Sequence, residues 1–326
     1  MTSDVLCLRP KVDFERSGAL PPESLTVTYR GFGEPDVSDL MKRAAALVIP
    51  AVGPAVPSEW FEGTSLRLVQ ITGAGLDRLD RTTMERLAIP VANVPGGSNR
   101  AVAEYAVTSA SVMLRRFAWA DAEIRQGGYV SFRARMVADN LQGLDGLMVG
   151  VVGLGTIGLA VAETFHHMGC RICYFDPTPR ECDATRAMGA TALPLDQLLA
   201  ASDVVSVHAP LVPATRGLLG DRELSLMKPG AVLVQASRGG VVDEQALAAH
   251  LRSGRLGGAA VDVYGQEPPP ADHPLFALEG DAARRLLLTP HIGGVTRQSA
   301  ALLGRSAWQN VERVLVAGQP PLNRAY

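Results

Sequence analysis

The segment VGVVGLGTIGLAVAETF, at residues 149–165, constrains the fold of this chain more than any other stretch. An apolar run typical of a buried strand leads into the glycine pattern G-x-G-x-x-G, and a helical pattern of apolar residues follows at once. A strand, a tight glycine turn and a helix in this order begin a doubly wound dinucleotide-binding sheet. The segment therefore predicts a Rossmann domain built on parallel strands.

The residues of this pattern have separate physical tasks. Gly153 permits the tight turn, and Gly158 lets the helix pack closely against the strand. Gly155 lets backbone amides approach a pyrophosphate, and the helix N-terminus adds a partial positive charge for the phosphates. We expect the first helical residues, Thr156 and Ile157, to belong to the same phosphate site.

An acidic residue, Asp176, stands at the position where Rossmann folds distinguish NAD from NADP. Asp176 comes directly after the next apolar run, 172–175. A carboxylate at this point accepts hydrogen bonds from the ribose hydroxyls and repels a 2′-phosphate, so the sequence favours NAD over NADP. Arg180, four residues later, would weaken that preference if it reached a 2′-phosphate.

Composition limits the classes of protein to which the chain can belong. Its 326 residues suffice for two domains, and 47% hydrophobic with 20% charged residues is typical of globular proteins. The formal net charge of −2 provides no basic field for a polyanion, so we expect no nucleic-acid partner. No apolar run approaches the ~20 residues that span a membrane, and the N-terminus does not resemble a signal peptide. We expect a cytoplasmic protein with no membrane contact.

Cysteine and histidine gather once, in the stretch FHHMGCRIC at residues 165–173. Metal binding or redox chemistry is one interpretation of this cluster. The alternative is that Cys173 lies in a buried strand and that His166 and His167 end a helix, where cations are mildly favoured. The sequence favours the second interpretation, so we expect no metal site, and four cysteines do not suggest a disulfide framework.

Apolar runs alternate with helical patterns along the chain, which is typical of parallel α/β sheets. We expect an α/β protein with two doubly wound parallel-sheet domains. A flavodoxin-like substrate domain is formed by residues 1–98 and completed by a C-terminal helix within 295–326, and the Rossmann NAD-binding domain, 99–294, is inserted between these parts.

The same patterns predict the individual elements. We expect an unbroken helix from about 101 to 124, a loop-like stretch from 126 to 146, and a final helix near 298–317. The predicted strands are the apolar runs 4–8, 26–30, 44–50, 66–72, 90–94, 147–152, 172–175, 203–207, 231–235, 257–263 and 285–289.

Polar residues recur where the later apolar runs end. Any one of them has an ordinary explanation as a turn residue, but ligands bind beyond the carboxyl ends of strands in open α/β sheets. Together they predict a polar cleft, in which the small neighbours of Arg238 leave room for a ligand. The polar residues are His208, which Ala209 and Pro210 follow, Arg238, which lies between Ser237 and the glycines 239 and 240, and then Asp262, Glu267 and His291.

Several motifs in this order resemble the D-isomer-specific 2-hydroxyacid dehydrogenase family. They are GLGTIG at 153–158, SRGGVVDEQAL at 237–247, AAVDVYGQEP at 259–268, TPHIGG at 289–294, and the substrate-side segments GAGLDRLD at 73–80 and NVPGGSNRAVAEYAV at 93–107. The resemblance covers nearly the whole chain and implies an NAD-dependent dehydrogenase of 2-hydroxy acids, acting as a 2-keto acid reductase. It also implies a homodimer, because the stretch 126–146 resembles the dimerisation arm of the family.

The resemblance implies roles for individual residues. Arg238 would bind the substrate carboxylate and carbonyl, His291 would donate or accept the proton, and Glu267 would be its partner. Asp262 would hold the nicotinamide carboxamide. The implied cofactor residues are Gly153, Gly155, Thr156, Ile157, Gly158, Asp176, His208, Ala209, Pro210, Thr215, Ala236, Ser237, Arg238, Asp262, His291 and Gly293, and the substrate residues are Gly73, Ala74, Gly75, Arg100, Arg238 and His291.

Residue 100 departs from the pattern of the family. Many members have a threonine or serine four residues before the acid of the V-A-E segment, where this chain has Arg100. One interpretation is an arginine that faces solvent near the start of a helix. The other is a second cation for a substrate with an additional anionic group, such as a phosphate, a phosphonate or a second carboxylate.

Two other functions fit the same motifs. A phosphonate (phosphite) dehydrogenase would share the fold and the Arg238, Glu267 and His291 constellation, and an NAD-sensing protein similar to a corepressor would bind the cofactor with little turnover. Turnover of NADH with a 2-keto acid distinguishes these functions from the dehydrogenase, since fold alone does not determine the substrate.

Overall fold

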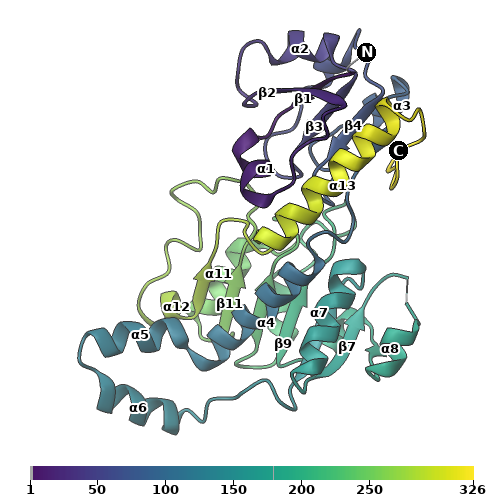
Figure 1. The fold of residues 1–326 in the computed structure, drawn as a ribbon. Helices are drawn as coiled ribbons and strands as arrows, with labels where there is room; N and C mark the ends of the chain where they lie inside the picture. Colours follow the sequence, from purple (N-terminus) through teal and green to yellow (C-terminus); the bar gives the residue numbers. More distant parts are fainter. Residues whose placement is uncertain (1–2, 179) are drawn as a thin grey trace. The chain divides into compact units, whose positions relative to one another are not determined.

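The computed structural model describes residues 3–178 and 180–326, which form two compact units. The smaller unit comprises the chain up to Ser98 together with Val295–Tyr326, and the larger unit is Asn99–Gly294. Each unit has its own parallel sheet, so the predicted fold class is confirmed. Figure 1 shows both sheets with helices packed against them.

The smaller sheet has the strand order β2-β1-β3-β4-β5 in the described chain. In this flavodoxin-like order the direction of winding changes between β1 and β3. Its strands are β1 (Ser3–Cys7), β2 (Leu25–Tyr29), β3 (Ala46–Ile49), β4 (Leu68–Ile71) and β5 (Val91–Ala92). Its helices are α1 (Lys11–Ser17), α2 (Val37–Arg43), the 3₁₀ turn η1 (Ser58–Phe61), α3 (Arg81–Arg86) and α13 (Arg297–Leu315).

Helix α13 returns from the end of the chain to cover one face of the smaller sheet. Thr296 caps its first turn by accepting a hydrogen bond from the Ser299 amide at 3.1 Å. Trp308 and Val311 are buried in the core cluster that this helix shares with β1, β3 and β4. Because both faces of β3 and β4 are covered, every residue of these two strands is buried, instead of every second one.

The larger sheet has the order β12-β11-β10-β9-β6-β7-β8 in the described chain, with the direction of winding changing between β6 and β9. Its strands are β6 (Met148–Val152), β7 (Arg171–Phe175), β8 (Thr191–Ala192), β9 (Val204–Val207), β10 (Val232–Gln235), β11 (Gly258–Val261) and β12 (Leu286–Leu288). Its helices are α4 (Asn99–Arg115), α5 (Phe117–Arg125), α6 (Tyr129–Ala138), α7 (Thr156–His167), α8 (Asp183–Ala187), α9 (Leu195–Ala201), α10 (Asp221–Leu226), α11 (Glu244–Arg252) and α12 (Gly280–Arg284).

Every predicted apolar run overlaps a strand of the structure. Strand β8 was not predicted, because it has only two residues and both are exposed. None of the helices in the described ranges is long and apolar enough to cross a membrane.

The helix predicted from about 101 to 124 is wrong as an unbroken element. Arg116 adopts a left-handed conformation, with φ 53°, and separates α4 from α5. The stretch from 126 to 146 also contains a helix, α6, that the sequence did not indicate. Tertiary contacts explain both differences, because the Arg116 side chain pairs with Asp139 beyond α6 and also lies over the Trp119 ring.

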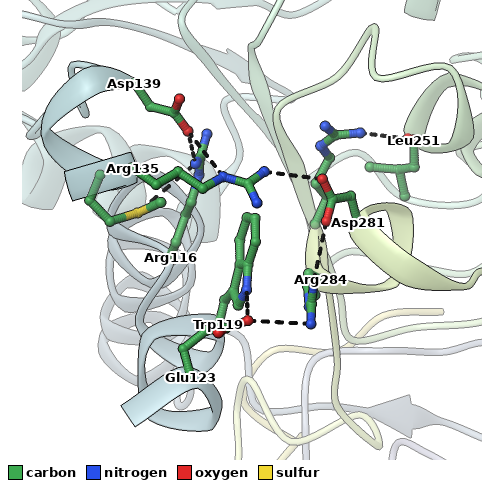
Figure 2. Close-up of polar contacts among 10 residues, drawn as sticks. Arg116, Trp119, Glu123, Arg135, Asp139, Leu251, Asp281 and Arg284 are labelled. Atoms are coloured by element: carbon green, nitrogen blue, oxygen red, sulfur yellow. Dashed lines mark hydrogen bonds and ion pairs between the residues drawn. The ribbon is translucent and has the colours of Figure 1, made fainter. Parts of the chain in front are cut away.

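A cluster centred on Trp119 attaches α5 and α6 to α12. Three guanidinium groups surround the buried indole ring, as Figure 2 shows: Arg116 and Arg135 come from the α5–α6 region, and Arg284 comes from α12. Arg135 also pairs with Asp281 of α12 at 3.1 Å. These cation–π and ionic contacts explain why the segment folds back on the larger unit.

Helix α6 also exposes apolar side chains. Tyr129, Val130 and Val137 are 61%, 79% and 67% exposed, respectively. The predicted homodimer would have to cover such side chains, and the oligomeric state stays a prediction.

Candidate active site

The glycine turn after β6 has the backbone geometry that its sequence predicts. Gly153 has φ 89°, and a Cβ on it would lie 2.8 Å from the backbone nitrogen of Ala209. A Cβ on Gly158 would lie 2.0 Å from the Gly153 carbonyl oxygen. Gly155 differs, because in the described chain nothing beyond its immediate neighbours in sequence lies within 4 Å of the position that its Cβ would take. Two glycines therefore permit close packing, and the third leaves open space at the start of α7.

The start of α7 and Asp176 are suited to a dinucleotide. Thr156 is the first residue of α7, so its amide and that of Ile157 have no acceptor within the helix. The Asp176 carboxylate accepts hydrogen bonds from the amides of Leu154, at 2.9 Å, and Thr178, at 3.0 Å. These contacts hold the acidic group beside the glycine turn.

His208 borders the same turn from the end of β9. Its Nε2 lies 2.7 Å from the Ser206 hydroxyl, whereas its Nδ1 is buried and has no hydrogen-bond partner in the described chain. Burial lowers the pKa of His208 to about 4, so the imidazole is neutral near pH 7. A buried polar atom without a partner is uncommon in native proteins. This atom is therefore consistent with a bound group that completes the site.

The loop after His208 is held by its own side chain. The Thr215 hydroxyl donates to the Pro210 carbonyl oxygen and accepts from the Val212 amide, the latter at 2.9 Å. Ala209 is buried behind this loop. Contacts of these residues with a cofactor stay predictions.

The loop that carries Arg238 is built on Gln235, for which we predicted no role. The Gln235 amide nitrogen donates to the Arg238 carbonyl oxygen at 2.9 Å, and its amide oxygen accepts from the Ser237 hydroxyl at 2.9 Å. The Arg238 guanidinium donates to the Ser237 carbonyl oxygen at 2.9 Å. Ala236 lies between these hydrogen-bonded residues at the end of β10.

Gly239, the residue after Arg238, has a structural role that differs from the one we predicted. We predicted that the glycines leave room for a ligand, but a Cβ on Gly239 would lie 1.8 Å from the Tyr264 carbonyl oxygen. Gly239 therefore allows its loop to pack directly on the loop after β11, which carries Glu267. This packing brings the Arg238 charge near the Glu267 carboxylate.

Glu267 and His291 are in direct contact, as expected of an acid–base couple. The His291 Nδ1 lies 2.8 Å from Glu267 Oε2, and Glu267 Oε1 accepts from the Tyr264 amide at 3.1 Å. Burial alone would raise the pKa of the Glu267 carboxyl. Hydrogen bonds from His291 and Tyr264, with the positive charge of Arg238, outweigh burial and lower that pKa. The side chains of His291 and Glu267 remain 23% and 28% exposed, so ligands can reach them.

Asp262 holds the turn that carries His291. Its buried carboxylate accepts hydrogen bonds from the Thr289 hydroxyl at 2.6 Å, the Ile292 amide at 2.9 Å and the Gly293 amide at 2.7 Å. Its carbonyl oxygen accepts from the His291 amide at 2.8 Å. His291 has φ 55°, a conformation that costs roughly 1–2 kcal/mol for a residue with a Cβ. The Asp262 bonds offset this strain, and its predicted contact with the nicotinamide carboxamide stays a prediction.

The predicted substrate residues 73–75 follow β4 in the smaller unit. The Gly73 and Ala74 carbonyl oxygens accept hydrogen bonds from the Val94 amide, at 2.8 Å, and the Asn93 side chain, at 2.7 Å. Within the described chain, the amides of Ala74 and Gly75 donate no hydrogen bond. Both amides are therefore available to an anion such as a carboxylate.

Arg100 lies in the first turn of α4 and is exposed. It has no hydrogen bond or ion pair within residues 3–178 and 180–326. Its guanidinium is therefore accessible, as both interpretations of this arginine require.

The cysteine and histidine cluster lies at the end of α7 and at the start of β7. Cys170 and Cys173 are buried, and burial raises the pKa of the Cys170 thiol to about 11, which makes it a poor nucleophile near pH 7. In the described part of the chain, no three His, Cys, Asp or Glu side chains are arranged to hold a metal ion.

Comparison with known proteins places the chain in a family. A family model described as "D-isomer specific 2-hydroxyacid dehydrogenase, NAD binding domain" matches residues 107–293, more than half of the chain. A glyoxylate reductase of Korarchaeum cryptofilum is 34% identical over 279 residues, covering 84% of this chain and 81% of the relative. An (S)-sulfolactate dehydrogenase of Chromohalobacter salexigens is 38% identical over 250 residues, covering 77% and 78%.

A solved structure agrees with this placement. The holo form of D-mandelate dehydrogenase from Rhodotorula graminis superposes with a TM-score of 0.84 at 25% identity, covering 100% of this chain and 98% of that one. The chain belongs to the D-isomer-specific 2-hydroxyacid dehydrogenase family. It is an NAD-dependent oxidoreductase that acts on the CH–OH group of 2-hydroxy acids.

The first prediction concerns the stability that the protein loses in acid because His208 is buried. Its pKa of about 4 lies below the unfolded value of about 6.5, so only the unfolded state binds the proton between these values. Stability should therefore fall as pH falls from about 6.5 to 4, by on the order of 3 kcal/mol from this residue. In denaturant titrations of the cofactor-free protein, the free energy of unfolding of His208→Gln should not show this additional fall with pH. The exposed His167→Gln is the control, and equal pH dependence in all three proteins would contradict burial of a neutral His208.

The second prediction concerns Asp176. Its carboxylate should make the enzyme prefer NADH to NADPH, because it repels a 2′-phosphate. Asp176→Ala should bring kcat/KM for NADH closer to kcat/KM for NADPH, mainly by changing the KM values of the two cofactors. Asp183→Ala removes an exposed carboxylate of α8 and should leave the ratio unchanged. Equal efficiency of the unmodified enzyme with both cofactors would rule out this role.

Proposed function

We propose that this enzyme reduces a 2-keto acid to a 2-hydroxy acid, with His291 as the proton donor and Arg238 as the cation beside the reacting oxygen. The observation that carries the proposal is the 2.8 Å contact between His291 and Glu267, close to Arg238 at the carboxyl edge of the larger sheet. An imidazole held by a carboxylate, next to a fixed guanidinium, suits reduction of a carbonyl.

The side chains divide the chemistry among them. When bound, the nicotinamide supplies the hydride that reduces the 2-keto carbon. Arg238 stabilises the negative charge that develops on the substrate oxygen and can bind the neighbouring carboxylate at two points. His291 protonates that oxygen, and in the oxidative direction it takes the proton back. Glu267 orients the imidazole and favours its charged form.

The free amides of Ala74 and Gly75 support a role in binding the substrate carboxylate. Two adjacent backbone donors without partners in the described chain are a common way to bind an oxyanion. We propose this contact as an addition to the one made by Arg238.

We further propose that the preferred substrate carries a second anionic group, which Arg100 recognises. The exposed, unpaired guanidinium in the first turn of α4 supports this proposal. So does the name of the 38% identical relative, since sulfolactate carries a sulfonate in addition to its carboxylate. The alternatives of a phosphonate dehydrogenase and an NAD-sensing protein are not favoured, because the named relatives are reductases and dehydrogenases of keto or hydroxy acids.

The third prediction tests His291 and Glu267. With NADH and a 2-keto acid, His291→Ala should lower kcat on the order of 10²–10⁴-fold, the usual contribution of general acid catalysis. NADH affinity, measured by fluorescence titration, should be retained because the glycine turn lies elsewhere on the sheet edge. Glu267→Gln removes the charge that favours the imidazolium, so the alkaline limb of the reduction profile should move to lower pH.

His250→Ala is the matched control, because this partly buried histidine of α11 pairs with the exposed Asp221 and not with Glu267. Near-normal turnover and an unchanged pH profile in His291→Ala would show that His291 is not the acid.

The fourth prediction tests Arg100. In a panel of 2-keto acids that includes sulfonated, phosphorylated and dicarboxylic ones, Arg100→Ala should raise KM for the doubly anionic substrates about 10- to 100-fold. KM for pyruvate should not change. Arg115→Ala removes the same charge from the other end of α4 and is the control. If all substrates respond alike, or none responds, Arg100 is a surface residue without a role in specificity.

A further inference from the structure

Tyr105, a residue of α4, contacts both ends of the turn that carries His291. Its hydroxyl lies 2.7 Å from the Thr289 hydroxyl, at the start of the turn. At the other end, a Cβ on Gly293 would lie 3.3 Å from the ring atoms Cγ and Cδ1 of Tyr105, so the ring packs on the Gly293 backbone. One side chain therefore spans the turn from residue 289 to residue 293.

The hydrogen bonds of this turn have a defined direction. An ionised carboxylate only accepts, so the Thr289 hydroxyl must donate its single proton to Asp262 at 2.6 Å. The Tyr105 hydroxyl must then donate to Thr289. Burial raises the pKa of the Tyr105 phenol, and the negative charge of Asp262 raises it further. Hydrogen bonds with Thr289 and Ser109 lower this pKa, but the net shift is upward. Tyr105 is therefore a neutral donor at neutral pH.

The hydrogen bonds from Tyr105 to Thr289 and from Thr289 to Asp262 form a relay, which holds the backbone segment that carries His291. The Asp262 carboxylate that receives the Thr289 proton also binds the amides of Ile292 and Gly293, on the far side of His291. His291 needs such support, because its left-handed backbone is uncommon for a residue other than glycine. A shift of Thr289 or Gly293 would move the imidazole relative to Glu267.

Tyr105 also joins two parts of the larger unit that are distant in sequence. The unit begins at Asn99, the first residue of α4, and ends at Gly294, directly after the turn. The contact between Tyr105 and the turn therefore links the segment that enters the unit to the segment that leaves it. The two segments are separated by 184 residues between Tyr105 and Thr289.

We propose that Tyr105 is a positioning residue for His291, which it acts on through Thr289 and Gly293. The proposal rests on the proposed function, because it matters for catalysis only if His291 is the acid. It assigns to Tyr105 no contact with substrate or cofactor.

The test uses Tyr105→Phe, which retains the ring and removes the hydroxyl. With NADH and a 2-keto acid, kcat should fall about 3- to 10-fold, as expected for the loss of one hydrogen bond. KM for NADH should not change, and the alkaline limb should move to lower pH as the imidazole loses its alignment with Glu267. The primary deuterium isotope effect on kcat should rise, because chemistry becomes slower relative to product release.

Two further variants separate the hydroxyl relay from the packing of the ring. Thr289→Val leaves Asp262 short of a donor and should lower kcat about 10- to 100-fold. Adding Tyr105→Phe to Thr289→Val should then have little further effect, because the hydroxyl acts through Thr289. Ser111→Ala is the control, since it removes a hydroxyl of α4 that donates to the Val107 carbonyl oxygen at 2.9 Å, within the helix itself.

The outcomes distinguish this proposal from the proposed function. If His291→Ala abolishes turnover while Tyr105→Phe keeps the kcat, pH limb and isotope effect of the wild type, Tyr105 only packs and the inference is wrong. If Tyr105→Phe lowers thermal stability but leaves those kinetic values unchanged, the inference is equally wrong. If His291→Ala keeps full turnover, the proposed function itself fails.

Discussion

The buried carboxylate of Asp262 is the group on which the geometry of the candidate site depends. It directly follows β11 and accepts hydrogen bonds from the Thr289 hydroxyl and from two backbone amides of the turn. A carboxylate can be buried in this way because its donors replace the water that it loses. In return it fixes a turn in which His291 adopts a strained conformation. Its loss would therefore displace the histidine as well as leave amides without partners. Asp262, at the end of β11, holds the turn in place, and the turn carries His291.

The charges of the site meet because two loops pack backbone against backbone. Gly239 lies against the Tyr264 carbonyl oxygen, at a distance that no side chain would allow. Glu244 reinforces this arrangement, since its carboxylate accepts from the Gly265 amide at 2.7 Å and contacts the buried His273 at 2.9 Å. Arg238 and Glu267 thus become neighbours although they follow different strands. The lowered pKa of Glu267 is the electrostatic result, and it keeps a negative charge beside His291 at neutral pH.

The sequence predicted what depends on local patterns and missed what depends on tertiary contacts. The glycine turn, the apolar strands and the fold class follow from short-range rules, and the structure confirms the fold class. The break at Arg116 was missed, because nothing near it in sequence disfavours a helix, and its cause is the distant Asp139 and the packing on Trp119. The roles of Gln235 and Thr289 were missed for a related reason. Amides and hydroxyls have ordinary places at strand ends, and only the folded loops show what they bind. Gly239 was predicted to be important, but the reason given was wrong.

His291 has to serve as the acid in reduction and as the base in oxidation, and the pH dependence of the unmodified enzyme in each direction shows whether it does. Single-turnover rates would be measured for keto-acid reduction with NADH and for hydroxy-acid oxidation with NAD. Reduction requires a charged His291 and oxidation requires a neutral one. If His291 serves both directions, the first rate falls at high pH and the second rate falls at low pH. Rates of reduction and oxidation that fall in the same pH direction would contradict this role of His291.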